Sequence, residues 1–135
     1  MIFSGHMIEE IVDLSGAIEK PEEFELLKER LDSVGLYSPD SLYHGFGYEN
    51  LRGVLSSELD LGSGEIYCST EKDMQLAYHF DNNSCNIFWF AYQSFKPAIL
   101  VLDPNHLDFR ECWLYSWNDS TRKKEAVRCV VHLRG

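Results

Sequence analysis

A histidine followed by a glycine, and two tyrosines eleven residues apart, are the residues whose types and spacing suggest a binding site. His44 closes a short apolar stretch, and Gly45 after it lets a ligand approach the backbone closely. Tyr67 lies in a strand-like stretch, and Tyr78 lies on the apolar side of a helical pattern. Taken singly, they fit a strand-end histidine bonded to a loop and two core aromatics. Taken together, they predict the walls of one pocket.

Other kinds of site are not indicated by the sequence. It contains no phosphate-binding loop, no dinucleotide-binding glycine motif, no GxSxG and no HExxH. The five histidines and four cysteines have no metal-ligand spacing, so we expect no metal site. Each cysteine lies in or beside an apolar stretch, which predicts buried, reduced thiols in a cytosolic protein. These cysteines are Cys68, Cys85, Cys112 and Cys129.

Length and charge narrow the classes of protein further. A chain of 135 residues with 44% hydrophobic residues predicts one domain, residues 1–135, with a real core. The formal net charge is −10, of which −7 falls in residues 1–40, so general nucleic-acid binding is not expected. The basic stretch 122–128 is read as a solvated loop or a contact for a small anion. No apolar run approaches the ~20 residues that a membrane helix needs, and the start does not resemble a secretory leader, which predicts no membrane contact and a cytoplasmic location.

The order of predicted elements indicates an α+β fold. Residues 7–35 are predicted to form an N-terminal helical segment, whose second helix begins at Pro21 and stops at Gly35. Its apolar stripe consists of Phe24, Leu27 and Leu31. Residues 41–135 form the predicted core. They are read as strand, helix, strand, helix and then four strands: LYHGFG, YENLRGVLSSEL, GEIYCS, TEKDMQLAYHF, NIFWFAYQSF, PAILVLD, ECWLYSW and EAVRCVVHLR. Because helices come early and strands late, α+β is favoured over α/β.

The ordered set of motifs resembles the ADP-ribosyltransferase superfold, in its diphtheria-toxin and poly(ADP-ribose)-polymerase branch. Residues 42–45, LYHG, resemble the first motif of that branch, a strand with His-Gly. Residues 50–59, NLRGVLSSEL, resemble its connecting helix, and residues 64–69, GEIYCS, resemble its second motif. Tyr78 matches a second tyrosine of the polymerase branch. The resemblance implies a split antiparallel β-sheet core, and it covers residues 41–80 more fully than the rest.

By this resemblance the ligand is NAD, used as a co-substrate. His44 would hydrogen-bond a ribose hydroxyl of the adenosine half, and the Gly45 backbone would clamp the nicotinamide carboxamide. Tyr67 and Tyr78 would sandwich the nicotinamide ring. A cationic pyridinium between two ring faces gains about 1–2 kcal/mol from each at best.

Two further residues complete the implied NAD site. Ser69 closes the second motif. Gln75 stands where the polymerase branch has a serine, and it would supply a different polar contact to the carboxamide.

The resemblance also implies a catalytic glutamate at the start of a late strand. Glu125, which begins EAVRCVVHL, is the preferred candidate, and Glu111 is its rival. A carboxylate there would stabilise the oxocarbenium-like state formed when the ribose–nicotinamide bond breaks, and it would orient the nucleophile. Alternatively, Glu125 is a surface acid paired with Lys123 or Lys124.

The activity implied is mono-ADP-ribosylation of a macromolecular acceptor, protein or nucleic acid, by an enzyme of toxin, effector or anti-defence type. The distance from Tyr67 to Glu125 is too short for a long acceptor-binding loop, so polymer elongation is not expected. NAD hydrolysis and RNA 2′-phosphotransfer are alternatives on the same superfold. A non-catalytic protein that binds a partner through its acidic face is the alternative from another class. The N-terminal segment would either cover the cleft or bind the target, or it would pack against the fold as a structural cap.

Overall fold

The computed structural model describes residues 6–13, 22–55, 64–73, 94–111 and 113–134. Its strands form two sheets, in which only β1 and β7 pair in parallel among the described strands. Sheet A has the order β1 (His6–Asp13), β7 (Val127–Arg134), β4 (Pro97–Leu102), β2 (Leu42–Gly47), and sheet B has the order β3 (Glu65–Tyr67), β6 (Leu114–Trp117), β5 (Leu107–Glu111). The helices are α1 (Glu22–Ser33) and α2 (Leu51–Leu55), with the 3-10 helices η1 (Tyr48–Asn50), η3 (Pro104–His106) and η4 (Ser120–Ala126). The fold is therefore mixed α+β, as predicted.

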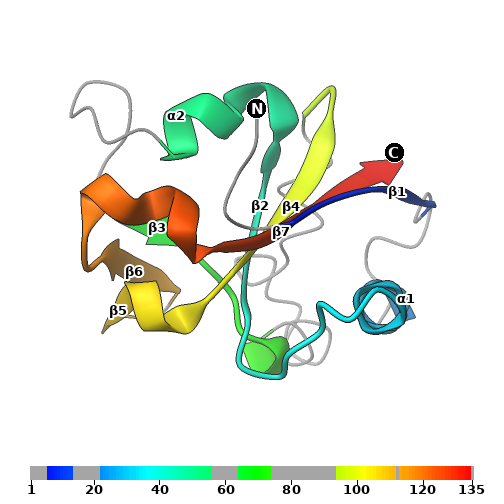
Figure 1. Ribbon diagram of the computed structural model, residues 1–135, viewed down its shortest axis with the longest axis horizontal. Coiled ribbons are helices and arrows are strands. Elements are labelled where there is room, and N and C mark those ends of the chain that lie inside the picture. The colour runs from blue at the N-terminus through cyan, green and yellow to red at the C-terminus, as the bar shows by residue number, and fades with distance from the viewer. Residues whose placement is uncertain (1–5, 14–21, 56–63, 74–93, 112, 135) are drawn as a thin grey trace.

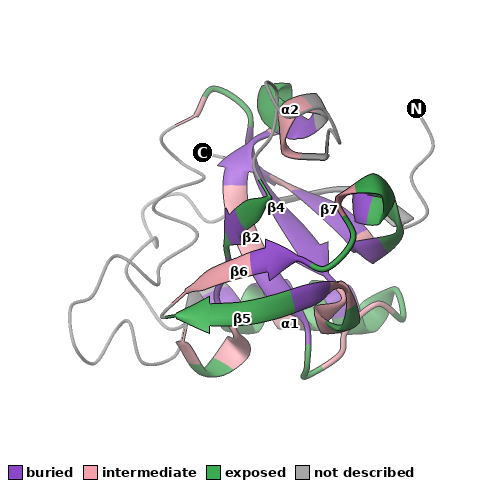
Figure 2. Ribbon diagram, turned by 90° about the vertical axis from the view of Figure 1, so that its left-hand side faces the viewer, coloured by how far each residue is buried: buried purple, intermediate pink, exposed green. Residues whose placement is uncertain are grey.

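Sheet A separates two apolar clusters. Helix α1 and sheet B lie on opposite sides of it (Figure 1). Successive residues of a strand point to opposite faces, so β2, β4 and β7 each supply both clusters. All six residues of β4 are buried, because both of its faces are covered (Figure 2). The α1 cluster consists of Phe24, Leu27, Leu31, Tyr43, Ile99, Val101, Cys129, Val131 and Leu133. The cluster on the sheet B side includes Leu42, Phe46, Leu51, Ile66, Cys68, Leu100, Leu107, Trp117 and Val130.

Helix α1 confirms the second predicted helix of the N-terminal segment. Its stripe of Phe24, Leu27 and Leu31 is at most 1% exposed. Gly35 ends the helix with φ of 76°, a left-handed conformation that favours glycine. The Leu36 amide then donates to the Leu31 carbonyl at 2.9 Å, which satisfies one of the last helical carbonyls.

The prediction of a helical segment over residues 7–35 is wrong at its start. Residues 6–13 form strand β1, which runs parallel to β7, with His6 opposite Cys129 and Asp13 opposite Arg134. Strand β7 lies inside the sheet, and without β1 the backbone groups along that side of β7 would have no partner strand. Pairing with a distant strand therefore outweighs the local apolar spacing that suggested a helix.

A single backbone bridge joins the two sheets. The amide of Tyr43 in β2 donates to the Ser69 carbonyl, and the Ser69 amide donates to the Tyr43 carbonyl, both at 2.9 Å. Continued antiparallel pairing would next place Gly45 opposite Tyr67, but no such pair forms. Strands β2 and β3 thus separate immediately after the bridge, and we call this point the fork.

The other strand and helix predictions have mixed outcomes. Strands β2, β3, β4, β6 and β7 lie where the sequence predicts strands, and η1 with α2 begins the predicted helix 48–59. Strand β5 was not predicted. The predicted helix after Thr70 is described only to residue 73, and most of the predicted strand 86–95 lies outside the described residues. None of the described helices is long and apolar enough to cross a membrane.

Candidate functional site

At the fork, the His44 side chain takes the place of the missing backbone pair. Its Nδ1 lies 2.6 Å from the carbonyl oxygen of Tyr67. In this position the Tyr67 carbonyl points from β3 toward β2, where a continued ladder would have used it. The sequence prediction that His44 and Tyr67 belong to one site is consistent with this contact.

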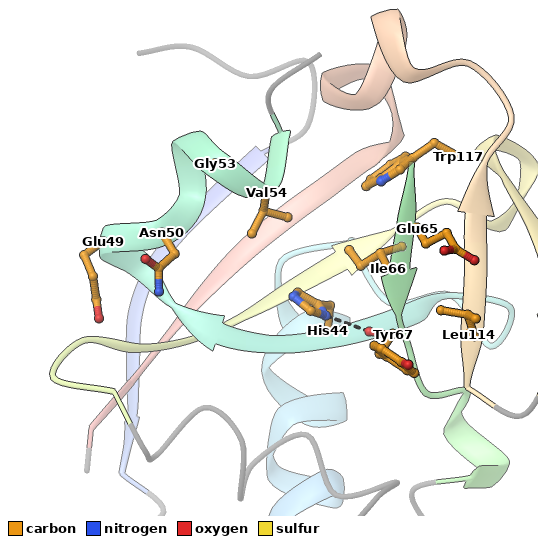
Figure 3. A pocket seen from close by; sticks show the side chains of 10 residues that line it. All are labelled: His44, Glu49, Asn50, Gly53, Val54, Glu65, Ile66, Tyr67, Leu114 and Trp117. Carbon is orange, nitrogen blue, oxygen red and sulfur yellow. Dashed lines mark hydrogen bonds between the residues drawn. The ribbon is translucent and has the colours of Figure 1, made fainter. Parts of the chain in front are cut away.

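Beyond the fork, β2 and β3 form opposite walls of an open cleft (Figure 3). Its volume is about 590 Å³, which is within the range of small-molecule sites. Helix η1 and α2 close one end, and β6 contributes to the other (Figure 3). The described residues that line it are His44, Glu49, Asn50, Gly53, Val54, Glu65, Ile66, Tyr67, Leu114 and Trp117.

The hydrogen bond at the fork sets the proton positions of His44. A carbonyl oxygen only accepts, so Nδ1 carries the proton and donates it to Tyr67. Burial lowers the pKa of His44 below its ordinary 6.5, and the bond to the Tyr67 carbonyl offsets part of this shift. The ring is therefore neutral at pH 7, and Nε2 is a hydrogen-bond acceptor. The ring lies in the middle of the cleft, so this acceptor suits a ligand hydroxyl (Figure 3).

Tyr67 is not a core residue, although a strand tyrosine usually is. Its side chain is 66% exposed and lines the cleft, while Ile66 before it is buried. Tyr43, one residue before His44, is by contrast completely buried under α1. An exposed aromatic ring beside a neutral imidazole is a suitable surface for stacking a planar ligand.

Gly45 and Ser69 contribute backbone groups, not side chains, to the region around the fork. The strand alternation directs the N–H and C=O of Gly45 to the same side of β2 as those of Tyr43, which is the side of β3. Ser69 is 2% exposed and forms the bridge with Tyr43. Neither residue is among those that line the cleft with side chains. Tyr78 and Gln75 lie outside the described residues.

The two predicted catalytic glutamates do not line the cleft with the described residues. Glu125 lies in η4, two residues before β7 begins, and its carboxylate is paired with the Arg122 side chain. This is the surface ion pair that the sequence suggested as an alternative, with Arg122 in place of a lysine. Glu111 is exposed at the end of β5, where it pairs with Leu114.

Two other carboxylates line the cleft, and the sequence reasoning missed both. Glu65 is in β3 two residues before Tyr67, and both are exposed because residues i and i+2 of a strand share a face. That alternation could have identified it. Glu49 is the middle residue of η1, the turn after β2, and packs over Gly47, where a Cβ atom would lie 2.5 Å from Oε1 of Glu49. Among the described residues of the cleft, none is a lysine or arginine.

Trp117, the last residue of β6 in sheet B, forms part of the cleft wall and contacts a buried lysine. The Nζ atom of Lys123 lies 5.4 Å from the centre of the Trp117 ring, within range of a cation–π contact. Lys123 is only 2% exposed, and burial lowers the pKa of its ammonium group. This contact helps to hold the indole ring in the cleft wall.

Two of the described arginines make hydrogen bonds to side chains of other residues. Arg110 donates to Ser116 at 2.9 Å. Arg128 donates to Asp40 and Ser41, each at 2.7 Å, and ties β7 to the loop before β2. A site for an RNA phosphate, which would need such arginines, is therefore not favoured by the described part of the cleft.

The described cysteines are structural. Cys68 and Cys129 are buried and form no disulfide, as predicted, and burial raises the pKa of the Cys129 thiol to about 12. Burial raises the pKa of Cys68 as well, so neither is a thiolate nucleophile at neutral pH. Cys85 and Cys112 lie outside the described residues. In the ranges that the structure covers, no three His, Cys, Asp or Glu side chains form a group that could hold a metal ion.

Helix α1 packs on the face of sheet A opposite the cleft, since its cluster includes Tyr43 and not His44. Of the two roles predicted for the N-terminal segment, α1 thus has that of a structural cover. Comparison with known protein families, curated proteins and solved structures gave no match for this chain.

Proposed function

We propose that this chain has an ADP-ribosyltransferase-like split sheet and cleaves NAD in the cleft, transferring ADP-ribose to a macromolecular acceptor. The observation that carries the proposal is the position of His44 at the fork. Its Nδ1–H is held by the Tyr67 carbonyl, so Nε2 is left to accept a hydrogen bond from a ribose hydroxyl. The resemblance of LYHG and GEIYCS to the two motifs of that superfold assigns the same two residues to one NAD site.

The exposed ring of Tyr67 supports the binding of nicotinamide. Its ring faces the cleft beside His44, where a pyridinium could stack on it. The N–H and C=O of Gly45 are directed to the same side of β2, and one donor with one acceptor matches a carboxamide. Stacking and paired backbone bonds together fix the orientation of the ring before reaction.

The reaction breaks the bond between C1′ of the ribose and N1 of nicotinamide, whose electron pair leaves with the neutral nicotinamide. Positive charge then develops on the ribose, and a nearby carboxylate stabilises it. Within the proposal, we assign the stabilisation of this charge to Glu65, because it lines the cleft on the same strand as Tyr67. A nucleophile of the acceptor attacks C1′ and loses its proton, and water in its place gives NAD hydrolysis.

Release of nicotinamide from NAD tests the proposal. The purified chain is incubated with NAD, with and without cell lysate, and free nicotinamide is measured by chromatography. We expect release above background, reduced by at least about tenfold in His44→Ala because the ribose contact is lost. No release under either condition would contradict the enzymatic function.

A second pair of variants tests which carboxylate acts. Glu65→Gln is expected to lower nicotinamide release by at least about tenfold, and Glu125→Gln by less than about twofold. The reverse order would return the catalytic part to Glu125. Circular dichroism spectra of both variants control for loss of structure.

A further inference from the structure

Both partners of the bridge at the fork are held from the side of helix α1, although α1 packs on the face of sheet A opposite the cleft. Tyr43, one partner, is completely buried in the α1 cluster, and its ring packs edge-on against Phe24 with 5.5 Å between the ring centres. Ser69, the other partner, is followed two residues later by Glu71, whose carboxylate contacts α1 and the loop after it.

The contacts of Glu71 involve two polar side chains. The Tyr37 hydroxyl donates to Oε2 of Glu71 at 2.7 Å, and the Lys28 ammonium group donates to Oε1 at 3.3 Å. Burial, followed by the bond to Glu71, raises the pKa of Tyr37, so its hydroxyl keeps the proton at neutral pH. The Glu71 side chain is only 17% exposed, and a hydrogen bond to a charged group shielded from water is among the stronger ones. We call these two contacts the Glu71 anchor.

The chain between the bridge and the anchor is short and ordered. Only Thr70 lies between Ser69 and Glu71. The Thr70 amide donates to Oδ2 of Asp73, and the Asp73 amide donates to the Thr70 hydroxyl, both at 3.1 Å. This reciprocal pair starts a helical turn directly after the bridge. A movement of Glu71 is therefore transmitted to Ser69, because no loose loop separates the two residues.

The bridge alone is a weak connection between β2 and β3. It consists of two backbone hydrogen bonds, and such bonds contribute little net stability because water can replace them. The Cys68 amide donates to the Trp113 carbonyl at 2.8 Å, which ties the same segment to sheet B and not to β2. If the bridge opens, β3 can move with sheet B, and the Tyr67 carbonyl can separate from Nδ1 of His44.

We infer that Glu71 is a positioning residue for His44, and that its contacts with Lys28 and Tyr37 keep the fork closed. Helix α1 thus stabilises the site as well as covering sheet A. The Glu71 anchor goes beyond the proposed function, because it acts on the chain without any ligand.

Hydrogen exchange of single protons, followed by NMR on the full chain, tests the Glu71 anchor. The amide protons of Tyr43 and Ser69 and the Nδ1 proton of His44 are the fork protons, because opening of the fork exposes them to water. In Glu71→Ala, we expect each of them to exchange about fivefold faster than in the wild type, because opening no longer breaks the anchor. Should this variant not fold, Tyr37→Phe removes the shorter of the two contacts and gives the same comparison.

The matched control is Asp119→Ala, which removes the N-cap of η4 and leaves the Glu71 anchor in place. Loss of such a cap destabilises the whole chain by a comparable amount. In this control the amides of β4, inside sheet A, should exchange faster, while the fork protons should stay within about twofold of the wild type. This difference separates local opening of the fork from global unfolding.

Three results would overturn the role of Glu71. The first is an unchanged exchange rate of the fork protons in Glu71→Ala. The second is an equal acceleration of these protons in Asp119→Ala. The third is a His44 proton that does not follow the amides of Tyr43 and Ser69.

The assay of nicotinamide release keeps the two proposals apart. If the fork protons respond as expected but no nicotinamide is released from NAD, the enzymatic function is wrong and the Glu71 anchor stands. If NAD is cleaved but the fork protons are unchanged in Glu71→Ala, the anchor is wrong and the proposed function stands.

Discussion

One face of strand β2 lies under helix α1 and the other lies at the cleft. Neighbouring residues of the strand lie on opposite faces. Tyr43 points into the α1 cluster and is fully buried, while His44 points toward the cleft and contacts the Tyr67 carbonyl. On the closed face, Tyr43 packs in an apolar cluster. On the open face, His44 lies between the buried Leu42 and Phe46, and the cleft beside it is also lined by Glu49 of η1 and Glu65 of β3. Strand alternation alone can therefore place a structural residue beside a functional one.

The largest expected effect comes from the closed face. Leu27→Ala removes a fully buried side chain of α1 and should lower the free energy of unfolding by about 2–5 kcal/mol. Leu26→Ala, at a neighbouring position that is 41% exposed, should lower it by less than about 1 kcal/mol. Urea unfolding measures both. Equal losses would mean that α1 does not cover sheet A as described.

Removing the Tyr43 hydroxyl should change the free energy of unfolding by less, and in the opposite direction. It is buried and makes no hydrogen bond to the part of the chain that the structure describes. Tyr43→Phe should therefore raise the free energy of unfolding by about 1 kcal/mol, since an unsatisfied polar group is removed. Tyr37→Phe is the matched variant, because the Tyr37 hydroxyl donates to Glu71 at 2.7 Å. This variant should lower the free energy of unfolding by about 1 kcal/mol. A loss of stability in Tyr43→Phe would show that the hydroxyl is bonded.

On the open face, stability should depend on pH through His44. Its pKa is lower in the folded chain than in the unfolded one, so the unfolded chain binds more protons between the two values. The stability that the neutral ring contributes is therefore fully present above about pH 6.5 and is lost as the pH falls toward the folded pKa. Between pH 7.5 and pH 5, the free energy of unfolding should fall more steeply for the wild type than for His44→Gln. Equal slopes would contradict the lowered pKa of this imidazole.

The smallest effect is expected at the ion pair outside both faces. Glu125 and Arg122 are about half exposed, and such pairs contribute little. Glu125→Gln should change the free energy of unfolding by less than about 0.5 kcal/mol, as measured by the urea midpoint. A loss above about 1 kcal/mol would mean that Glu125 has a contact beyond Arg122.

Much of the fold could be predicted where local pattern and tertiary packing agree. The stripe of Phe24, Leu27 and Leu31 with a stop at Gly35 fits α1 residue by residue. The unbroken apolar run of β4 fits a strand covered on both faces. Strand β1 could not be predicted this way, because its partner β7 is far away in the sequence. Strand β5 was missed because Leu107 is its only buried residue.

The site was predictable in part. His44 and Tyr67 could be paired because their motifs have recognisable spacing, and the structure brings them into contact. Glu125 was chosen from strand order, but order does not say which way a side chain points in the turn before a strand. Whether Glu49 and Glu65 line the cleft depends on how far β2 and β3 diverge, and a sequence pattern does not give that distance.

The pairing of β1 with β7 has a consequence for how the chain folds. His6 lies opposite Cys129, so the strand inside sheet A joins residues from both ends of the described chain. Closing so long a loop costs entropy before any contact is gained. A high average separation of contacting residues slows folding, so this chain should fold in milliseconds to seconds rather than microseconds.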